Sequence, residues 1–178
     1  AGFESTGIDD NATSTAITID ASEKVTLASS VSPQLTLNRS VATGDAAMEF
    51  QSNGAVVGGI TSTTAGDMLL QTGSSLTERM RIDAAGNVGI GVVPEYWNST
   101  YRQALQIGHS VSLSAHKSTN ILVLANNAYY DGNDTRWEYI NSGEEAAQIE
   151  MTAGGAITFD VAPSGTADAA ISWTTAMT

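Results

Sequence analysis

The sequence predicts an all-β protein built as an elongated fibre, in which β-hairpin stalk repeats alternate with small globular β-modules. Apolar and polar side chains alternate with a period of two along most of the chain, as in strands with one buried face. Glycine, asparagine and aspartate separate these stretches, as expected of tight turns. Helical periodicity is nearly absent, and 95–105 (EYWNSTYRQAL) is the one segment where a helical turn is plausible.

One hairpin-sized unit occurs three times in the chain. The segments 16–27 (AITIDASEKVTL), 79–90 (RMRIDAAGNVGI) and 148–159 (QIEMTAGGAITF) align without gaps. In the second copy Gly86-Asn87 can adopt positive φ, which predicts a turn between two antiparallel strands. The first copy has ASEKV in place of that turn, so we expect its hairpin to be looser or absent. WTTAMT at 173–178 matches LTERMR at 76–81, and we expect the natural chain to continue with another copy.

Each copy places its apolar side chains on one face. An isolated two-stranded hairpin is marginal in water, so this face needs a partner, and symmetry-related copies of the same chain can supply it. After the turn of the second copy, Val92 is expected to extend the apolar face, while Gly89 and Gly91 on the opposite face allow close approach of another backbone. The predicted stalk core consists of Ile17, Ile19, Met80, Ile82, Val88, Ile90, Met151 and Ile157.

The pattern divides the chain into five segments. Residues 1–30 form a stalk segment, 31–77 a small β-module and 78–94 a stalk hairpin. Residues 95–147 form a knob-like, aromatic β-module, and 148–178 return to the stalk pattern and stop within a repeat.

Composition and charge exclude several classes of protein. The chain carries 19 Asp or Glu against seven Lys or Arg, a net charge of −12. Nucleic-acid binding needs clustered cations that displace phosphate counterions, so this class is excluded. The chain has no cysteine, which rules out disulfides and thiolate metal sites. No apolar run approaches the roughly 20 residues of a membrane span, and nothing indicates a cofactor.

Three stretches resemble modules in tail-fibre and minor structural proteins of tailed bacteriophages. They are SLTERMRIDAAGNVGIGVVP, NNAYYDGNDTRWEYINSGEEAAQIEM and TFDVAPSGTADAAISWTTAMT, and the similarity covers most of residues 60–178. In that family a RIDssGNVGIG hairpin recurs along fibrous trimers, often before a C-terminal intramolecular chaperone. No chaperone-like segment occurs within these 178 residues. The resemblance implies a β-rich homotrimer on a virion, with adhesion to a host surface as its purpose.

Aromatic side chains concentrate after residue 94 and provide the candidates for receptor binding. Flat rings stack on sugars while their polar tips reach hydroxyl groups. The alternative is that most of these rings fill the core of 95–147 or a subunit boundary. The candidates are Trp97, Tyr101, Tyr129, Tyr130, Trp137 and Tyr139.

Metal binding is not predicted. His109 and His116 lie seven residues apart without further ligands, whereas a zinc site needs three or four convergent ones. Asp131, Asn133 and Asp134 in YDGND offer oxygen ligands for calcium, but without the spacing of an EF-hand loop; an Asp-Gly hairpin turn is the preferred interpretation.

Catalytic residues are not predicted either. The glycines of GNVGIGVVP do not open a helix after a strand, as a dinucleotide-binding loop must. Glu144 and Glu145 are adjacent, and adjacent side chains on a strand point to opposite faces, so they are poorly placed to act together on a glycan.

These observations predict a non-enzymatic segment of a virion tail fibre. Its expected partners are copies of itself, other virion tail proteins and a host cell-surface glycan, bound weakly at each site and strengthened by avidity. Two alternatives stay open. One is a tailspike-type glycan depolymerase, and the other is a bacterial surface adhesin or filament subunit.

Overall fold

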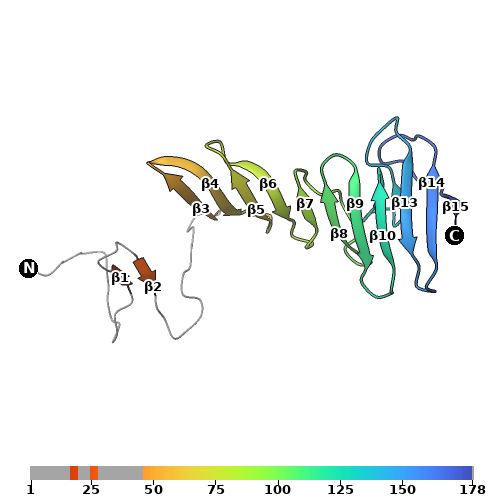
Figure 1. Cartoon of the computed structure of the whole chain (residues 1–178), viewed down its shortest axis with the longest axis horizontal. Helices are drawn as coiled ribbons and strands as arrows, with labels where there is room; N and C mark the ends of the chain where they lie inside the picture. Colours follow the sequence, from red (N-terminus) through yellow and green to blue (C-terminus); the bar gives the residue numbers. More distant parts are fainter. Residues whose placement is uncertain (1–16, 20–24, 28–45, 178) are drawn as a thin grey trace, which may run out of the picture. The chain divides into compact units, whose positions relative to one another are not determined.

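The computed structural model describes residues 17–19, 25–27 and 46–177, and their only regular secondary structure is β-strand (Figure 1). The prediction of an all-β protein is therefore confirmed. The chain divides into two units, residues 1–38 and 39–178. In the first unit, β1 (Ile17–Ile19) pairs with β2 (Val25–Leu27) in an antiparallel hairpin.

The second unit is organised around one 11-stranded sheet. Figure 1 shows these strands side by side, in the order β15-β14-β13-β10-β9-β8-β7-β6-β5-β4-β3. Strands β11 (Tyr129–Tyr130) and β12 (Trp137–Glu138) form a separate two-stranded ribbon. The strands of the large sheet are β3 (Ala46–Ser52), β4 (Ala55–Ser62), β5 (Met68–Thr72), β6 (Thr77–Ile82), β7 (Val88–Ile90), β8 (Arg102–Ile107), β9 (Val111–His116), β10 (Leu122–Asn126), β13 (Ala146–Met151), β14 (Ile157–Ala162) and β15 (Thr174–Met177).

The three sequence repeats form three hairpins with the same register. Ile17 pairs with Leu27 in the first copy, and the equivalent pairs are Met80 with Ile90 and Ile149 with Phe159. The first copy was expected to be looser or absent, yet β1 and β2 pair over their full length. Its unusual turn, residues 20–24, lies outside the described residues.

Close backbone approach at Gly89 is confirmed. A Cβ atom there would collide with the carbonyl oxygen of Val92 and lie 2.8 Å from Cδ of Pro94. The expectation for Val92 is wrong, because β7 ends at Ile90 and Gly91, with a φ of 68°, turns the chain back over Gly89. This reversal starts the crossover 91–101, after which β8 pairs with β7 in parallel, unlike the other paired strands described.

The segment 95–105 contains a turn and the start of a strand. The backbone N–H of Arg102 donates to the carbonyl of Asn98 at 2.8 Å, and the chain then continues into β8. No α-helix forms within the described residues.

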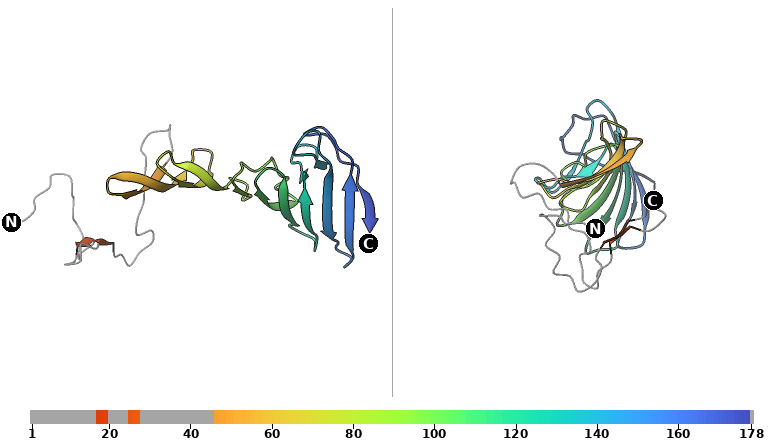
Figure 2. Two further views of the ribbon diagram at one scale, coloured as in Figure 1. Left: turned by 45° about the horizontal axis from the view of Figure 1, so that its top comes forward. Right: turned by 90° about the vertical axis from the view of Figure 1, so that its left-hand side faces the viewer.

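The polypeptide covers one face of the sheet from β8 onward. Buried and exposed residues alternate along β8, β9, β10, β13 and β14, with one face under the connections that carry β11, β12 and residues 163–173 (Figure 2). Under these connections lie two apolar clusters. One contains Val123, Ala125, Ala128, Tyr139, Ala146 and Ala162, and the other contains Trp97, Ala104 and Tyr129.

Candidate functional site

The opposite face of the sheet carries rows of apolar side chains that the described residues leave uncovered. Each strand of this sheet from β5 to β15 contributes one apolar residue that pairs directly with an apolar residue on the neighbouring strand. This row, called here the central row, consists of Met68, Ile82, Val88, Leu105, Leu113, Leu124, Ile149, Phe159 and Met177.

Two further rows flank the central row on the same face, because residues two apart on a strand share a face. One runs from β3 to β9 and contains Met48, Ile60, Leu70, Met80, Ile90, Ile107 and Val111. The other spans β10, β13 and β14 and contains Leu122, Met151 and Ile157. We call the three rows together the apolar face.

The apolar face is accessible in a single chain. Leu124 is 45% exposed, Met151 47% and Ile157 48%. The chain has 26 charged residues, 19 acidic and seven basic, but none lies on this face of β7–β10, β13 or β14. On these strands no charge opposes burial of the apolar face against another apolar surface.

The predicted stalk core of the second and third repeats lies on the apolar face. Met80, Ile82 and Val88 are half-buried by their neighbours, whereas Ile90, Met151 and Ile157 are exposed. The side chains of Ile17 and Ile19 lie outside the part of the chain whose side chains the structure describes. The apolar stripes predicted in two separate repeats thus belong to one continuous surface.

Most of the aromatic receptor candidates lie in the covered core. Trp97, Tyr129 and Tyr139 are only 2–4% exposed, while Tyr130 and Trp137 are half-buried. Edge-to-face contacts join Trp97 to Tyr129 and to Trp137, with ring centroids 6.1 and 6.4 Å apart. These contacts fit the core-packing interpretation and leave Tyr101, 42% exposed, as the accessible candidate in the set.

Hydrogen bonds fix the polar ends of the buried rings. Tyr139 donates its hydroxyl to the carbonyl of Pro163 at 2.6 Å, tying residues 163–173 to the core. Tyr129 lies 3.0 Å from carboxylate oxygens of both Glu138 and Asp168. Burial, and then hydrogen bonding to these carboxylates, raises the pKa of Tyr129, which keeps the phenol protonated.

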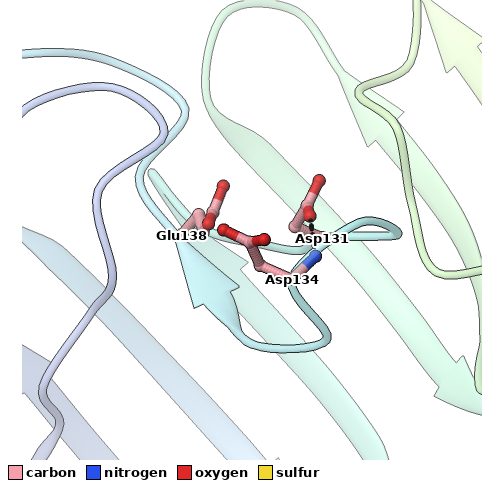
Figure 3. Close-up of side chains that lie close together, drawn as sticks. All are labelled: Asp131, Asp134 and Glu138. Atoms are coloured by element: carbon pink, nitrogen blue, oxygen red, sulfur yellow. Dashed lines mark hydrogen bonds between the residues drawn. The ribbon is translucent and has the colours of Figure 1, made fainter.

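Asp131, Asp134 and Glu138 bring carboxylates close together (Figure 3), with ligand atoms within 4.8 Å of one another. Asp131 Oδ2 accepts the backbone N–H groups of Asn133 and Asp134 at 2.6 Å, the aspartate turn expected from YDGND. Arg136 pairs with Asp134 and Glu138 at 2.8 Å. Since these partners occupy the carboxylates, the arrangement is explained as a hydrogen-bonded turn.

The remaining polar candidates do not converge on a common site. His109 lies in the turn before β9 and His116 is the last residue of β9, and neither belongs to a cluster of metal-ligand side chains in the described residues. Glu144 and Glu145 are exposed before β13, and their backbone carbonyls accept hydrogen bonds from Nδ2 of Asn127.

Sequence reasoning missed Arg102 and Glu138. Arg102 is 6% exposed on the covered face of β8, and the Nε and Nη1 atoms of its guanidinium have no hydrogen-bond partner. Alternation along RQALQI could have indicated that Arg102 shares a face with buried Ala104 and Gln106. Glu138 pairs with Tyr129 across the β11–β12 ribbon and with Arg136 two residues earlier, and its burial also depends on a bridge to Ala170 outside this hairpin.

Comparison with protein-family models, curated proteins and solved structures gave no match. In the part of the chain that the structure describes, no helix is long and apolar enough to cross a membrane.

Proposed function

We propose that this chain is a structural, non-enzymatic segment of a homotrimeric virion fibre that takes part in attachment to a host surface. The observation that carries the proposal is the apolar face, which runs across the sheet without charge from β7 to β14 and is left open by the described residues of its own chain. Contiguous exposed apolar patches of more than a few hundred Å² are rare on monomers and mark contact surfaces.

Burial of this face between copies supplies a substantial driving force. Fully burying a leucine side chain contributes about 1.5–3 kcal/mol. Leu124 is still 45% exposed in the folded single chain, so burying the rest of its side chain on association would contribute about 1 kcal/mol. Summed over the three rows, the gain is about 10 kcal/mol or more per chain, before the cost of association.

The repeats support a fibre more than a closed globule. The same hairpin, in the same register, recurs in both units of the chain. Repetition of one unit with one apolar stripe suits assembly around a common axis, since each copy presents an equivalent surface to its neighbours. The choice of three chains, the position on a phage particle and contacts with other tail proteins rest on the resemblance to tail-fibre modules.

The mass of the full chain in solution tests the proposal. Multi-angle light scattering should give three times the chain mass of 18.4 kDa. A folded monomer would overturn the proposal. A dimer would overturn the three-fold arrangement, since two sheets packed face to face would bury the same rows.

A further inference from the structure

A cavity of about 360 Å³ lies on the covered side of the sheet, opposite the apolar face. It is lined by Tyr101, Arg102, His116, Tyr130 and Thr135. Arg102 and His116 are cross-strand partners on β8 and β9, while Tyr130 and Thr135 come from the β11–β12 hairpin. Assembly through the apolar face would leave this cavity accessible.

Among the described residues, Arg102 is a buried cation without an ion-pair partner. It is 6% exposed, its Nε and Nη1 atoms have no hydrogen-bond partner, and it forms none of the ion pairs found in the described residues. Its guanidinium carbon lies 5.2 Å from the ring centroid of Tyr130 and 5.1 Å from that of Trp137. Ring faces attract a cation, but they do not replace the hydrogen bonds it loses on leaving water.

Nearby charge compensates Arg102 only in part. Burial lowers the pKa of Arg102, while the charges of Glu150 and Tyr130 raise it. Glu150 forms no ion pair with Arg102. Arg102 lines the cavity, so an anion that enters it would lie beside a guanidinium that has no ion-pair partner among the described residues.

The rim of the cavity has a defined shape. The Tyr130 hydroxyl donates to the carbonyl of Thr135 at 2.9 Å, and Thr135 has a φ of 56°, a backbone conformation that β-branched residues rarely adopt. The ring of Tyr101 lies against that of His116, with centroids 5.8 Å apart and planes inclined by 33°, and Tyr101 stays exposed. The two tyrosine rings offer stacking surface for a sugar ring and the guanidinium offers a partner for its carboxylate, whereas inorganic phosphate has no ring to stack.

We propose that the Arg102 cavity binds the carboxylate of an acidic sugar, with the sugar ring against Tyr101 and Tyr130. This inference rests on the proposed attachment role and names the chemical class of the glycan. The sequence predicted a glycan site made of aromatic rings alone. The proposed site combines two of those rings, Tyr101 and Tyr130, with the positive charge of Arg102.

The test is calorimetric titration of the full chain with glucuronate, glucose and inorganic phosphate as probes. Glucuronate should bind at least about tenfold more tightly than glucose, because only glucuronate carries the carboxylate. Equal binding of glucuronate and glucose would overturn the proposal. Phosphate binding as tight as glucuronate binding would show a general anion site and would also overturn it.

Variants locate the binding. Arg102→Met should abolish the preference for glucuronate, whereas Arg79→Met should retain it, because exposed Arg79 lies on β6 and donates to Thr72. Should Arg102→Met fail to fold, Tyr101→Ala removes an exposed ring and should weaken glucuronate binding about threefold to tenfold. Unchanged binding in Tyr101→Ala would contradict the proposed pose.

The same samples separate the two proposals. A trimer that does not bind glucuronate overturns the sugar site and leaves the fibre assembly standing. A monomer that binds glucuronate overturns the fibre assembly and leaves the sugar site standing.

Discussion

Replacing Leu124 by aspartate gives a quantitative test of the apolar face. Leu124 lies on β10 in the central row, between Leu113 on β9 and Ile149 on β13. In an isolated chain it is 45% exposed, so a carboxylate could remain in water and the change would cost little more than the leucine contacts. In an assembly closed over the apolar face, the carboxylate would be buried without a partner.

The expected loss in the assembly follows from two contributions. Removing the leucine forfeits about 1 kcal/mol of association free energy per chain, from its 45% residual exposure. Burying an unpaired carboxylate costs several kcal/mol more. A loss of at least about 4 kcal/mol per chain, repeated in every copy, would dissociate the oligomer at micromolar concentration.

Sedimentation velocity across a range of concentrations measures this effect. Leu124→Asp should sediment as smaller species than the unmodified chain at every concentration. Val93→Asp is the matched control, because Val93 is 57% exposed and lies in the crossover after β7, outside the apolar face. The reasoning is refuted if Leu124→Asp assembles as well as Val93→Asp.

Three further predictions concern the fold. In urea unfolding, Gly89→Ala should lower the free energy of unfolding by about 2 kcal/mol or more, because the added Cβ would collide with the crossover backbone. Gly154→Ala is the control: its Cβ would meet no atom closer than 3.9 Å, so the free energy of unfolding should change by less than about 0.5 kcal/mol. Asp67→Ala should cost about 2–3 kcal/mol in the same assay, since Asp67 pairs with Arg81 at 2.5 Å and accepts the backbone N–H of Ala84 at 2.9 Å; a loss below about 0.5 kcal/mol would contradict this. Burial raises the pKa of Asp160, but hydrogen bonds from Thr175, Gln148 and Thr158 outweigh burial, so the pKa in the folded state is lowered. The stability that this carboxylate contributes is present above its unfolded-state pKa of about 4 and is lost as pH falls through the folded-state pKa. Below about pH 4, the unfolding free energy of the unmodified chain should therefore depend more steeply on pH than that of Asp160→Asn.

The hairpins were predictable from sequence because strand pairing follows a period of two. Aligning the repeats also aligned their registers, so Met80 pairs with Ile90 as Ile149 pairs with Phe159. Gly89 signalled a close backbone approach because only glycine leaves room for one. Hairpin register and the close approach at Gly89 both depend on residues near one another in the chain, so a short stretch of sequence is enough to predict them.

Features that depend on distant segments were not predictable. The parallel pairing of β7 with β8 depends on the path of the crossover 91–101, in which buried Trp97 forms a bridge with Asp131. Aromatic spacing alone did not distinguish a glycan surface from a core, because Tyr139 is buried by residues 163–173, which lie beyond its own module. Arg102 had a readable position on β8, but its lack of an anionic partner depends on residues from other elements.

Methionine oxidation tests most directly whether copies of the chain bury the apolar face. All five methionines lie on it, namely Met48, Met68, Met80, Met151 and Met177, and all but Met80 are exposed in a single chain. Peroxide converts an accessible methionine to its sulfoxide, and peptide mass spectrometry gives the rate at each site. The native assembly should oxidise much more slowly than the urea-unfolded chain at Met68 and Met151. Oxidation of these two residues at the unfolded rate in the native protein would contradict burial of the apolar face between chains.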